Sequence, residues 1–124
     1  MSTTARLAKI SSRVKGHHEY QHSYKVGEKF NCYPQPDNVF SRHAIVVKSC
    51  NKKTIGHIPD GLANILFTLM KDGKVKRIYG EIIGIARSAP EGTWTQGGGI
   101  ELPCRYYIYG DLKYKDVVRE KLRK

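Results

Sequence analysis

The spacing of hydrophobic and polar residues predicts short β-strands in the first half of the chain. Over residues 28–33, Phe30 and Cys32 alternate with polar residues, which is the two-residue period of a half-buried strand. Residues 43–49 are apolar and β-branched, as in a central strand. After the turn "CNKK", residues 54–58 continue as the second strand of a hairpin. We therefore expect three strands before the first helix.

That helix is predicted within residues 59–74, because apolar residues recur there at positions i, i+3, i+4, i+7 and i+8. They are Leu62, Ile65, Leu66, Leu69 and Met70. Asp60 is placed to cap the start of the helix, and Gly73 is placed to follow its end.

Two longer strand patterns occupy the second half of the chain. Residues 74–87 are rich in β-forming residues, and we expect a bulge or bend at Gly80 and Gly84. Residues 100–110 carry an apolar residue at every second position. Five or six strands around one helix predict a small β-barrel, or a strongly curved sheet closed by a helix. The expected fold class is mainly β with one or two helices.

Local charge suggests how this chain of one domain's length is organised. Residues 1–15 hold four bases and no acid among Ser and Thr, and we interpret them as a basic, partly disordered arm. Residues 16–110 form the predicted barrel domain. Residues 111–124 hold six bases and three acids and predict a basic C-terminal helix or tail, capped by Asp111. The alternative is that both ends are solvated termini that aid solubility.

The whole chain is strongly basic, with 22 Lys and Arg against 11 Asp and Glu and a formal net charge of +11. Such a balance favours a polyanionic partner, usually nucleic acid and sometimes an acidic membrane surface. No run of 18 apolar residues is present, and the N-terminus lacks the apolar core of a secretory signal. We expect an intracellular protein, nuclear if its source is eukaryotic, that does not enter a membrane.

The cysteines and histidines do not form a recognisable catalytic or metal-binding pattern. Cys32, Cys50 and Cys104 are an odd number, widely spaced and inside or beside apolar segments, which favours reduced, buried thiols. Catalysis by Cys32 or Cys50 would need His43 or His57 as base, but their spacing is not diagnostic. No paired Cys-x-x-Cys or compact Cys and His cluster predicts a zinc site.

Other enzyme classes are also disfavoured. Carboxylates are sparse and scattered, which argues against a paired-acid hydrolase or a magnesium-dependent nuclease. The segment "GTWTQGGGI" lacks the Lys and Ser or Thr of a phosphate-binding loop, and we interpret it as a hairpin connection. Within it, Trp94 either stacks on a base or a partner, or covers the end of the barrel. We therefore predict neither an enzyme nor a cofactor.

Aromatic and basic residues are interleaved in two short segments. Single-stranded nucleic acids bind where cations meet phosphates and aromatic rings stack on bases. Phe40, Arg42 and His43 form one such cluster. The earlier segment "HHEYQHSYK" contributes His17, His18, Tyr20, His22 and Tyr24. The alternative, that these tyrosines belong to the core and rim of the barrel, has equal weight from composition.

The order of motifs resembles the HIRAN domain, a module found at the N-terminus of the helicase-like transcription factor and in small stand-alone proteins. The resemblance spans residues 16–110 and includes "PDNVFSRHAIVVKS", "IGHIPDGLANILFTLM", "GEIIG" and "IELPCRYYIYG". Its most specific parts are the run Asn38–Ile45 and the pair Gly56 and His57. It implies a modified oligonucleotide-binding (OB-like) barrel and, in helicase-associated members, capture of the 3′ end of single-stranded DNA.

The resemblance also implies roles for particular residues. Phe40 matches an aromatic that stacks on a terminal base, and His57 matches a histidine near the phosphates. Ser41 falls where the family has an aspartate that contacts the terminal hydroxyl, so it offers a hydrogen bond without the charge. Asp60 falls on a lysine position and reverses a charge. The family's Arg-Tyr pair falls near His18 and Glu19, its ring supplied by Tyr20, and a late phenylalanine falls near Ile100.

These observations lead to one main hypothesis. The chain binds nucleic acid, single-stranded DNA more than RNA, through stacking by Tyr20, Phe40 and Trp94. His18, Ser41, Arg42, His43 and His57 supply the polar and charged contacts, and DNA repair is the expected context. The main alternative is a protein-interaction domain that has lost recognition of DNA ends and self-associates or binds a peptide through an exposed edge strand, "CRYYIYG". A thiol-dependent or metal-dependent enzyme is a third class.

Overall fold

The computed structural model describes residues 3–16, 25–38, 42–85, 87–88 and 100–123. Its strands are β1 (Thr4–Gly16), β2 (Lys29–Pro34), β3 (Ile45–Ser49), β4 (Thr54–His57), β5 (Arg77–Ile82), β6 (Arg87–Ser88) and β7 (Ile100–Asp111). Its helices are α1 (Asp60–Lys71), a short 3-10 turn η1 (Leu112–Tyr114) and α2 (Lys115–Leu122). None of these helices is long and apolar enough to cross a membrane.

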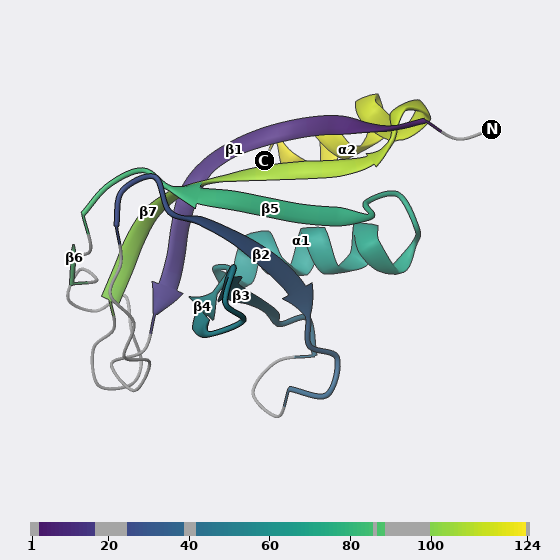
Figure 1. Ribbon diagram of the computed structural model, residues 1–124. Helices are drawn as coiled ribbons and strands as arrows, with labels where there is room; N and C mark the ends of the chain where they lie inside the picture. Colours follow the sequence, from purple (N-terminus) through teal and green to yellow (C-terminus); the bar gives the residue numbers. More distant parts are fainter. Residues whose placement is uncertain (1–2, 17–24, 39–41, 86, 89–99, 124) are drawn as a thin grey trace.

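Six of the strands form a closed antiparallel barrel. The order β1-β4-β3-β2-β5-β7 returns to β1, because β1 also pairs with β7 along its whole length, and β6 adds a short pairing to the start of β7. The closure between β1 and β4 is a single pair, Lys15 with His57. Figure 1 shows β1 and β7 bending together around the barrel, with β5 and β2 beside them and both helices behind. The predicted fold class, mainly β with one or two helices, is confirmed, and the structure has two.

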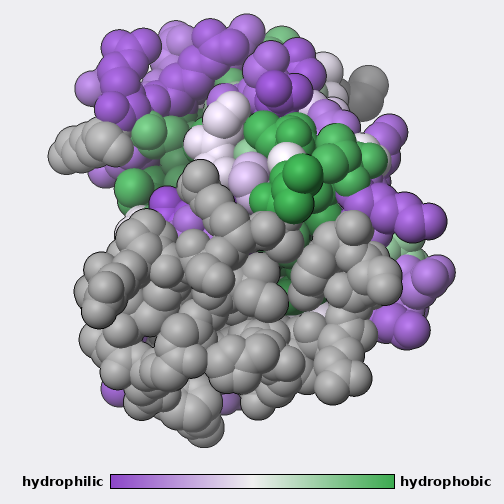
Figure 2. Space-filling view, turned by 90° about the vertical axis from the view of Figure 1, so that its left-hand side faces the viewer, coloured by the Kyte–Doolittle hydropathy of each residue, from purple (hydrophilic) through white to green (hydrophobic). Residues whose placement is uncertain are grey.

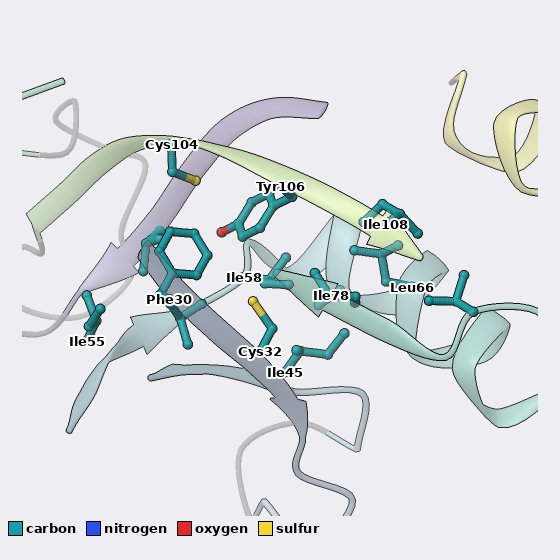
Figure 3. Close-up of a cluster of buried hydrophobic side chains, with 14 of the residues drawn as sticks. Phe30, Cys32, Ile45, Ile55, Ile58, Leu66, Ile78, Cys104, Tyr106 and Ile108 are labelled. Atoms are coloured by element: carbon teal, nitrogen blue, oxygen red, sulfur yellow. The ribbon is translucent and has the colours of Figure 1, made fainter. Parts of the chain in front are cut away.

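The inward residues of the strands and one face of α1 form the core. In Figure 3, side chains from β2, β3, β5, β7 and α1 converge inside the barrel. The ring of Phe30 meets the ring of Tyr106 edge to face, with 5.7 Å between centroids. The Tyr106 hydroxyl donates a 2.6 Å hydrogen bond to the carbonyl oxygen of Arg13. A buried phenol needs such a partner, and this one links β7 to β1 inside the closed sheet.

The N-terminal segment corrects the arm interpretation of residues 1–15, because Thr4–Gly16 is strand β1 and not a partly disordered arm. Leu7 and Val14 are fully buried. The register shifts between Arg6 and Ala8, so the inward positions change from odd to even numbers within the strand. This bulge interrupts the two-residue period and explains why the hydrophobic pattern is weak in the sequence.

The ends of the helices agree only partly with the expected caps. Pro59, and not Asp60, precedes α1, and no side chain caps that start. Gly73 follows the end of α1 with φ of +77°, a left-handed conformation that favours glycine, as expected. Near the C-terminus, Asp111 accepts a hydrogen bond from the backbone N–H of Lys113 at the start of η1. The predicted basic helix then follows as α2.

Gly80 has a packing role that differs from the predicted bulge or bend. Its pairing is regular, with Phe30 on one side and Tyr106 on the other. A Cβ atom at this position would lie within 2.3 Å of the Phe30 ring and 2.7 Å of the carbonyl oxygen of Arg105. The absent side chain therefore makes room for the Phe30 ring. The predicted long strand also differs, since β5 ends at Ile82 and β6 begins at Arg87.

Replacing this glycine tests the tight packing of the barrel. We expect Gly80→Ala to lower the free energy of unfolding by about 1–3 kcal/mol, because the new methyl group overpacks the core against a backbone oxygen. Urea denaturation followed by circular dichroism measures the change. Gly61→Ala is the matched control, because a Cβ there meets no atom within 4 Å. Equal stability of the two variants would contradict the role assigned to Gly80.

Candidate nucleic-acid interface

One end of the barrel brings together polar residues from several strands, centred on His57. This residue ends β4 and pairs with Val46 of β3 and with Lys15 of β1. Its imidazole Nε2 lies 2.9 Å from Oε1 of Gln35, which follows β2. The half-buried His57 ring therefore has a fixed position where three strands meet and a fourth ends.

Gln35 also fixes the segment that leads into β3. Its backbone N–H donates to the carbonyl oxygen of Ala44, at 2.8 Å. The Asn38 side-chain amide donates to Gln35 Oε1 at 3.2 Å, and the Asn38 N–H donates to the Gln35 carbonyl oxygen at 3.1 Å. Because one side chain touches both His57 and Asn38, the turn after β2 and the end of β4 are held together.

Arg42 and His43 are exposed immediately before β3. The His43 ring contacts the Phe67 ring of α1 edge to face, with 5.1 Å between centroids. Arg42 is exposed and lies outside the buried core. We name the five residues Lys15, Gln35, Arg42, His43 and His57 the basic lip.

Asp60, an acidic residue beside the basic lip, is partly offset by a basic residue. Asp60 was expected to reverse the charge where the family has a lysine. Its carboxylate is 81% exposed and lies 3.9 Å from the Lys15 ammonium. An exposed pair at this distance contributes little to stability, but it places a cation beside the acid. The lip therefore keeps a cationic character despite Asp60.

The structure brings together three of the predicted binding residues, Arg42, His43 and His57. The other five lie outside the described residues: His18, Tyr20, Phe40, Ser41 and Trp94. Sequence reasoning missed Lys15 and Gln35 as part of this end of the barrel. Lys15 was assigned to an arm, and Gln35 lies between two prolines in a segment interpreted only as a turn. The pairing of Gly16 with Ile100 brings the first and last strands to the same end.

Two of the three cysteines are buried, as predicted, but Cys50 is exposed in the turn after β3. The expectation of three buried thiols is wrong for Cys50 because the apolar strand ends at Ser49. Burial raises the pKa of the Cys104 thiol to about 12 and the pKa of Cys32 well above its ordinary value. Both groups stay protonated at neutral pH, and a protonated thiol is a poor nucleophile.

Thiol labelling checks this difference between the cysteines. We expect one thiol of the folded protein to react rapidly with an aromatic disulfide reagent at about pH 8, because Cys50 is the exposed cysteine that the reagent can reach. Cys50→Ser should remove the rapid phase, and denaturation should expose the other two thiols. Rapid reaction of the Cys50→Ser variant would contradict the burial of Cys32 and Cys104.

Hydrophobic residues also gather at the surface near the start of β2 and the end of β5. Val26 is 63% exposed, Ile83 38% and Ile85 83%. The backbone N–H of Gly27 donates to the Ile82 carbonyl oxygen at 2.7 Å, which holds these two turns together. Figure 2 shows an area of hydrophobic residues on this side of the molecule, next to strongly hydrophilic ones. Among the described residues, no three potential metal ligands lie close enough to hold an ion.

The fold and the basic lip together define a small closed antiparallel β-barrel with two helices and a cationic end. The sequence matches the HIRAN domain family over residues 9–113, and the chain belongs to that family. The predicted resemblance is therefore confirmed, and both the match and β1 begin before the expected domain start at Gly16.

Solved structures of known proteins have the same fold. The crystal structure of the HIRAN domain of human HLTF has a TM-score of 0.74 at 18% identity, over 97% of this chain and 90% of that chain. The NMR structure of the HLTF HIRAN domain in its DNA-bound conformation has a TM-score of 0.68 at 20% identity, over 97% and 89%. A crystal structure of a protein from Lactobacillus plantarum has a TM-score of 0.53 at 19% identity, over 83% and 97%. A comparison with curated protein sequences finds no matching relative.

Proposed function

We propose that this HIRAN domain binds single-stranded DNA at the basic lip. The observation that carries the proposal is the pairing of Lys15 with His57 at the end of the barrel where β1, β3 and β4 meet, with the exposed Arg42 three residues before β3 begins. Cations grouped at one end of an OB-like barrel suit the phosphates of a single strand. The DNA-bound conformation of the HLTF HIRAN domain supports the same class of ligand.

The proposed site is completed by residues outside the described part of the chain. Phe40 and Tyr20 supply aromatic rings on which bases stack, His18 supplies a polar contact, and Trp94 is a third candidate ring. Ser41 immediately precedes Arg42 and offers a hydroxyl to the strand. A hydroxyl is a neutral partner, so it discriminates a free 3′ end less strongly than a carboxylate would. We therefore propose binding to single strands with little dependence on the 3′ end.

Competition between matched oligonucleotides tests this function. A labelled single strand with a free 3′ hydroxyl is displaced by unlabelled strands of the same sequence, either free or blocked by a 3′ phosphate, and by a duplex. We expect the two single strands to compete equally and the duplex to compete weakly. Strong preference for the free end would show that Ser41 preserves end recognition. Equal competition by the duplex would contradict stacking on unpaired bases.

Protein interaction is a second candidate function, but it rests on different residues from those predicted. The segment "CRYYIYG" is not an exposed edge, because β7 pairs with β5 on one side and with β1 on the other. The prediction that this segment is an exposed edge strand for self-association or peptide binding is therefore wrong. The exposed apolar residues Val26, Ile83 and Ile85 favour a protein contact instead. A role in DNA repair and a nuclear location remain proposals.

A further inference from the structure

The outer face of the barrel carries a second group of aromatic and basic residues, away from the basic lip. Strand register places Tyr79 of β5 opposite Tyr107 of β7, and Arg77 opposite Tyr109. On the other side of β7, Lys9 of β1 lies opposite Tyr107, and Arg6 lies opposite Tyr109. We name these six residues the tyrosine face. Its three tyrosines form the centre, and its three bases flank them.

Contacts within the tyrosine face keep the rings and the charges together. The rings of Tyr79 and Tyr109 meet edge to face, with 5.5 Å between centroids. The Arg6 guanidinium carbon lies 5.7 Å from the centre of the Tyr107 ring. An Arg77 N–H donates a 2.9 Å hydrogen bond to the Tyr79 hydroxyl. These contacts leave the three tyrosines half-buried and outward-facing, while the three bases remain exposed.

The tyrosine face is positively charged, because the acid beside it already has partners. Glu81 accepts a 2.5 Å hydrogen bond from the Tyr107 hydroxyl and lies 3.9 Å from Arg105. In the neighbouring strand β2, Lys29 is the residue that pairs with Glu81. One carboxylate therefore faces several cations. No described helix covers this side of the sheet, since α1 and α2 lie behind the strands in Figure 1.

Cross-strand aromatic pairs alone would stabilise the sheet without binding anything. The tyrosine face has more than such a pair, because exposed basic residues flank its half-buried tyrosines on both sides. A single strand of nucleic acid needs this combination, in which nucleobases stack on aromatic rings and phosphates contact basic side chains. An acidic peptide would use the cations but would leave the rings without stacking partners.

We propose that the tyrosine face is a second surface for single-stranded nucleic acid, on which a strand continues after it leaves the basic lip. The route follows β1, which carries Lys15 at the lip and Lys9 at the tyrosine face. Six residues of strand separate them, about 20 Å at about 3.3 Å a residue. Arg13 lies on the same outward side between them, in an ion pair of 3.1 Å with Glu101. The inference rests on the proposed function for the lip, but it adds a second site with its own residues.

Oligonucleotides of two lengths distinguish binding at the basic lip from binding at the tyrosine face. The full chain is titrated with oligodeoxythymidines of about 4 and about 16 nucleotides, the range of site sizes on OB-like folds. The test variant is Arg6→Gln with Arg77→Gln. The matched control, Lys71→Gln with Lys121→Gln, removes the same charge from exposed positions on α1 and α2. Melting curves establish that both variants are folded.

For the long strand, the test variant should reduce the slope of log affinity against log salt by about 1.4, because two phosphate contacts are lost at about 0.7 each. The control should change neither the affinity nor the slope, and the short strand should bind both variants equally. An equal loss in test and control would overturn the inference. Loss of short-strand binding in the test variant would also overturn it, because the sites would not be separate.

Photocrosslinking of the wild-type protein provides a readout that does not depend on folded variants. A long strand containing bromodeoxyuridine should form adducts at Tyr79, Tyr107 or Tyr109. Adducts confined to the lip would overturn the inference, as would displacement of the long strand by an equally charged polyglutamate. Binding of long strands that depends on Arg6 and Arg77, without any binding of short strands, would instead refute the proposed function of the lip and leave the tyrosine face standing.

Discussion

Affinity for a short single strand should fall about 7-fold when monovalent salt rises from about 50 to about 200 mM, for about two phosphate contacts at about 0.7 each. The two basic residues of the lip, Lys15 and Arg42, would release cations that are condensed on the DNA. Fluorescence anisotropy with a labelled oligonucleotide measures the affinity at each salt concentration.

Single substitutions assign the salt dependence to the lip. Arg42→Gln should reduce the slope of log affinity against log salt by about 0.7, the value for one contact with a single strand. Lys71→Gln, at an exposed position on α1, should leave it unchanged. An affinity that does not respond to salt would contradict a phosphate-dominated site, and an equal effect of both variants would contradict its location.

Replacing Phe40 by alanine should weaken binding by about 1–3 kcal/mol, or about 5-fold to 150-fold, because one stacking ring is lost. The position follows from the family resemblance, in which Phe40 matches the aromatic that stacks on a terminal base. The same anisotropy titration at low salt measures the loss.

Two controls accompany the Phe40 variant. Val117→Ala shortens an exposed side chain on α2 and should bind like the wild type. Phe40→Tyr should retain most of the affinity, because a phenol ring stacks as a phenyl ring does. If Phe40→Ala bound as tightly as the wild type, Phe40 would have no stacking role, and Tyr20 or Trp94 would be the next ring to test.

Much of the barrel could be predicted from local sequence patterns. Residues around Phe30 and the alternating segment near Tyr106 bury the side chains that their period places inward, and the continuous β-branched strand after His43 is buried at successive positions, as in a central strand. The helix also follows its apolar spacing, with Leu66 and Leu69 buried. These elements were predictable because each of them keeps one local pattern from start to end: alternation, a continuous apolar run, or helical spacing.

The remaining features depend on contacts between distant segments. The bulge between Arg6 and Ala8 changes the phase of β1, so the strand lacks a single period. The role of Gly80 depends on the Phe30 ring from another strand. The segment around Tyr106 looked like a possible edge because alternation reports which side chains are inward, and it does not report how many neighbours a strand has.

The candidate site was likewise predictable only where local sequence patterns mark its residues. Arg42, His43 and His57 could be selected from charge and from the family motif. The hydrogen bond between His57 Nε2 and Gln35 Oε1 joins residues 22 positions apart, and no local pattern indicates it. The tyrosine face was missed for a similar reason. Its tyrosines belong to two strands and its flanking bases to β1 and β5, so only the register reveals that they adjoin.

The most direct test of the account is an NMR titration of the isotopically labelled protein with a single strand of about four nucleotides, a length that suits one OB-like site. At low salt, the account predicts saturable shifts of the backbone amides of Lys15, Arg42, His43 and His57, with small changes at Val117 and Val118 of α2. The absence of shifts at the lip, with or without binding elsewhere, would contradict the claim that this end of the barrel binds single-stranded DNA.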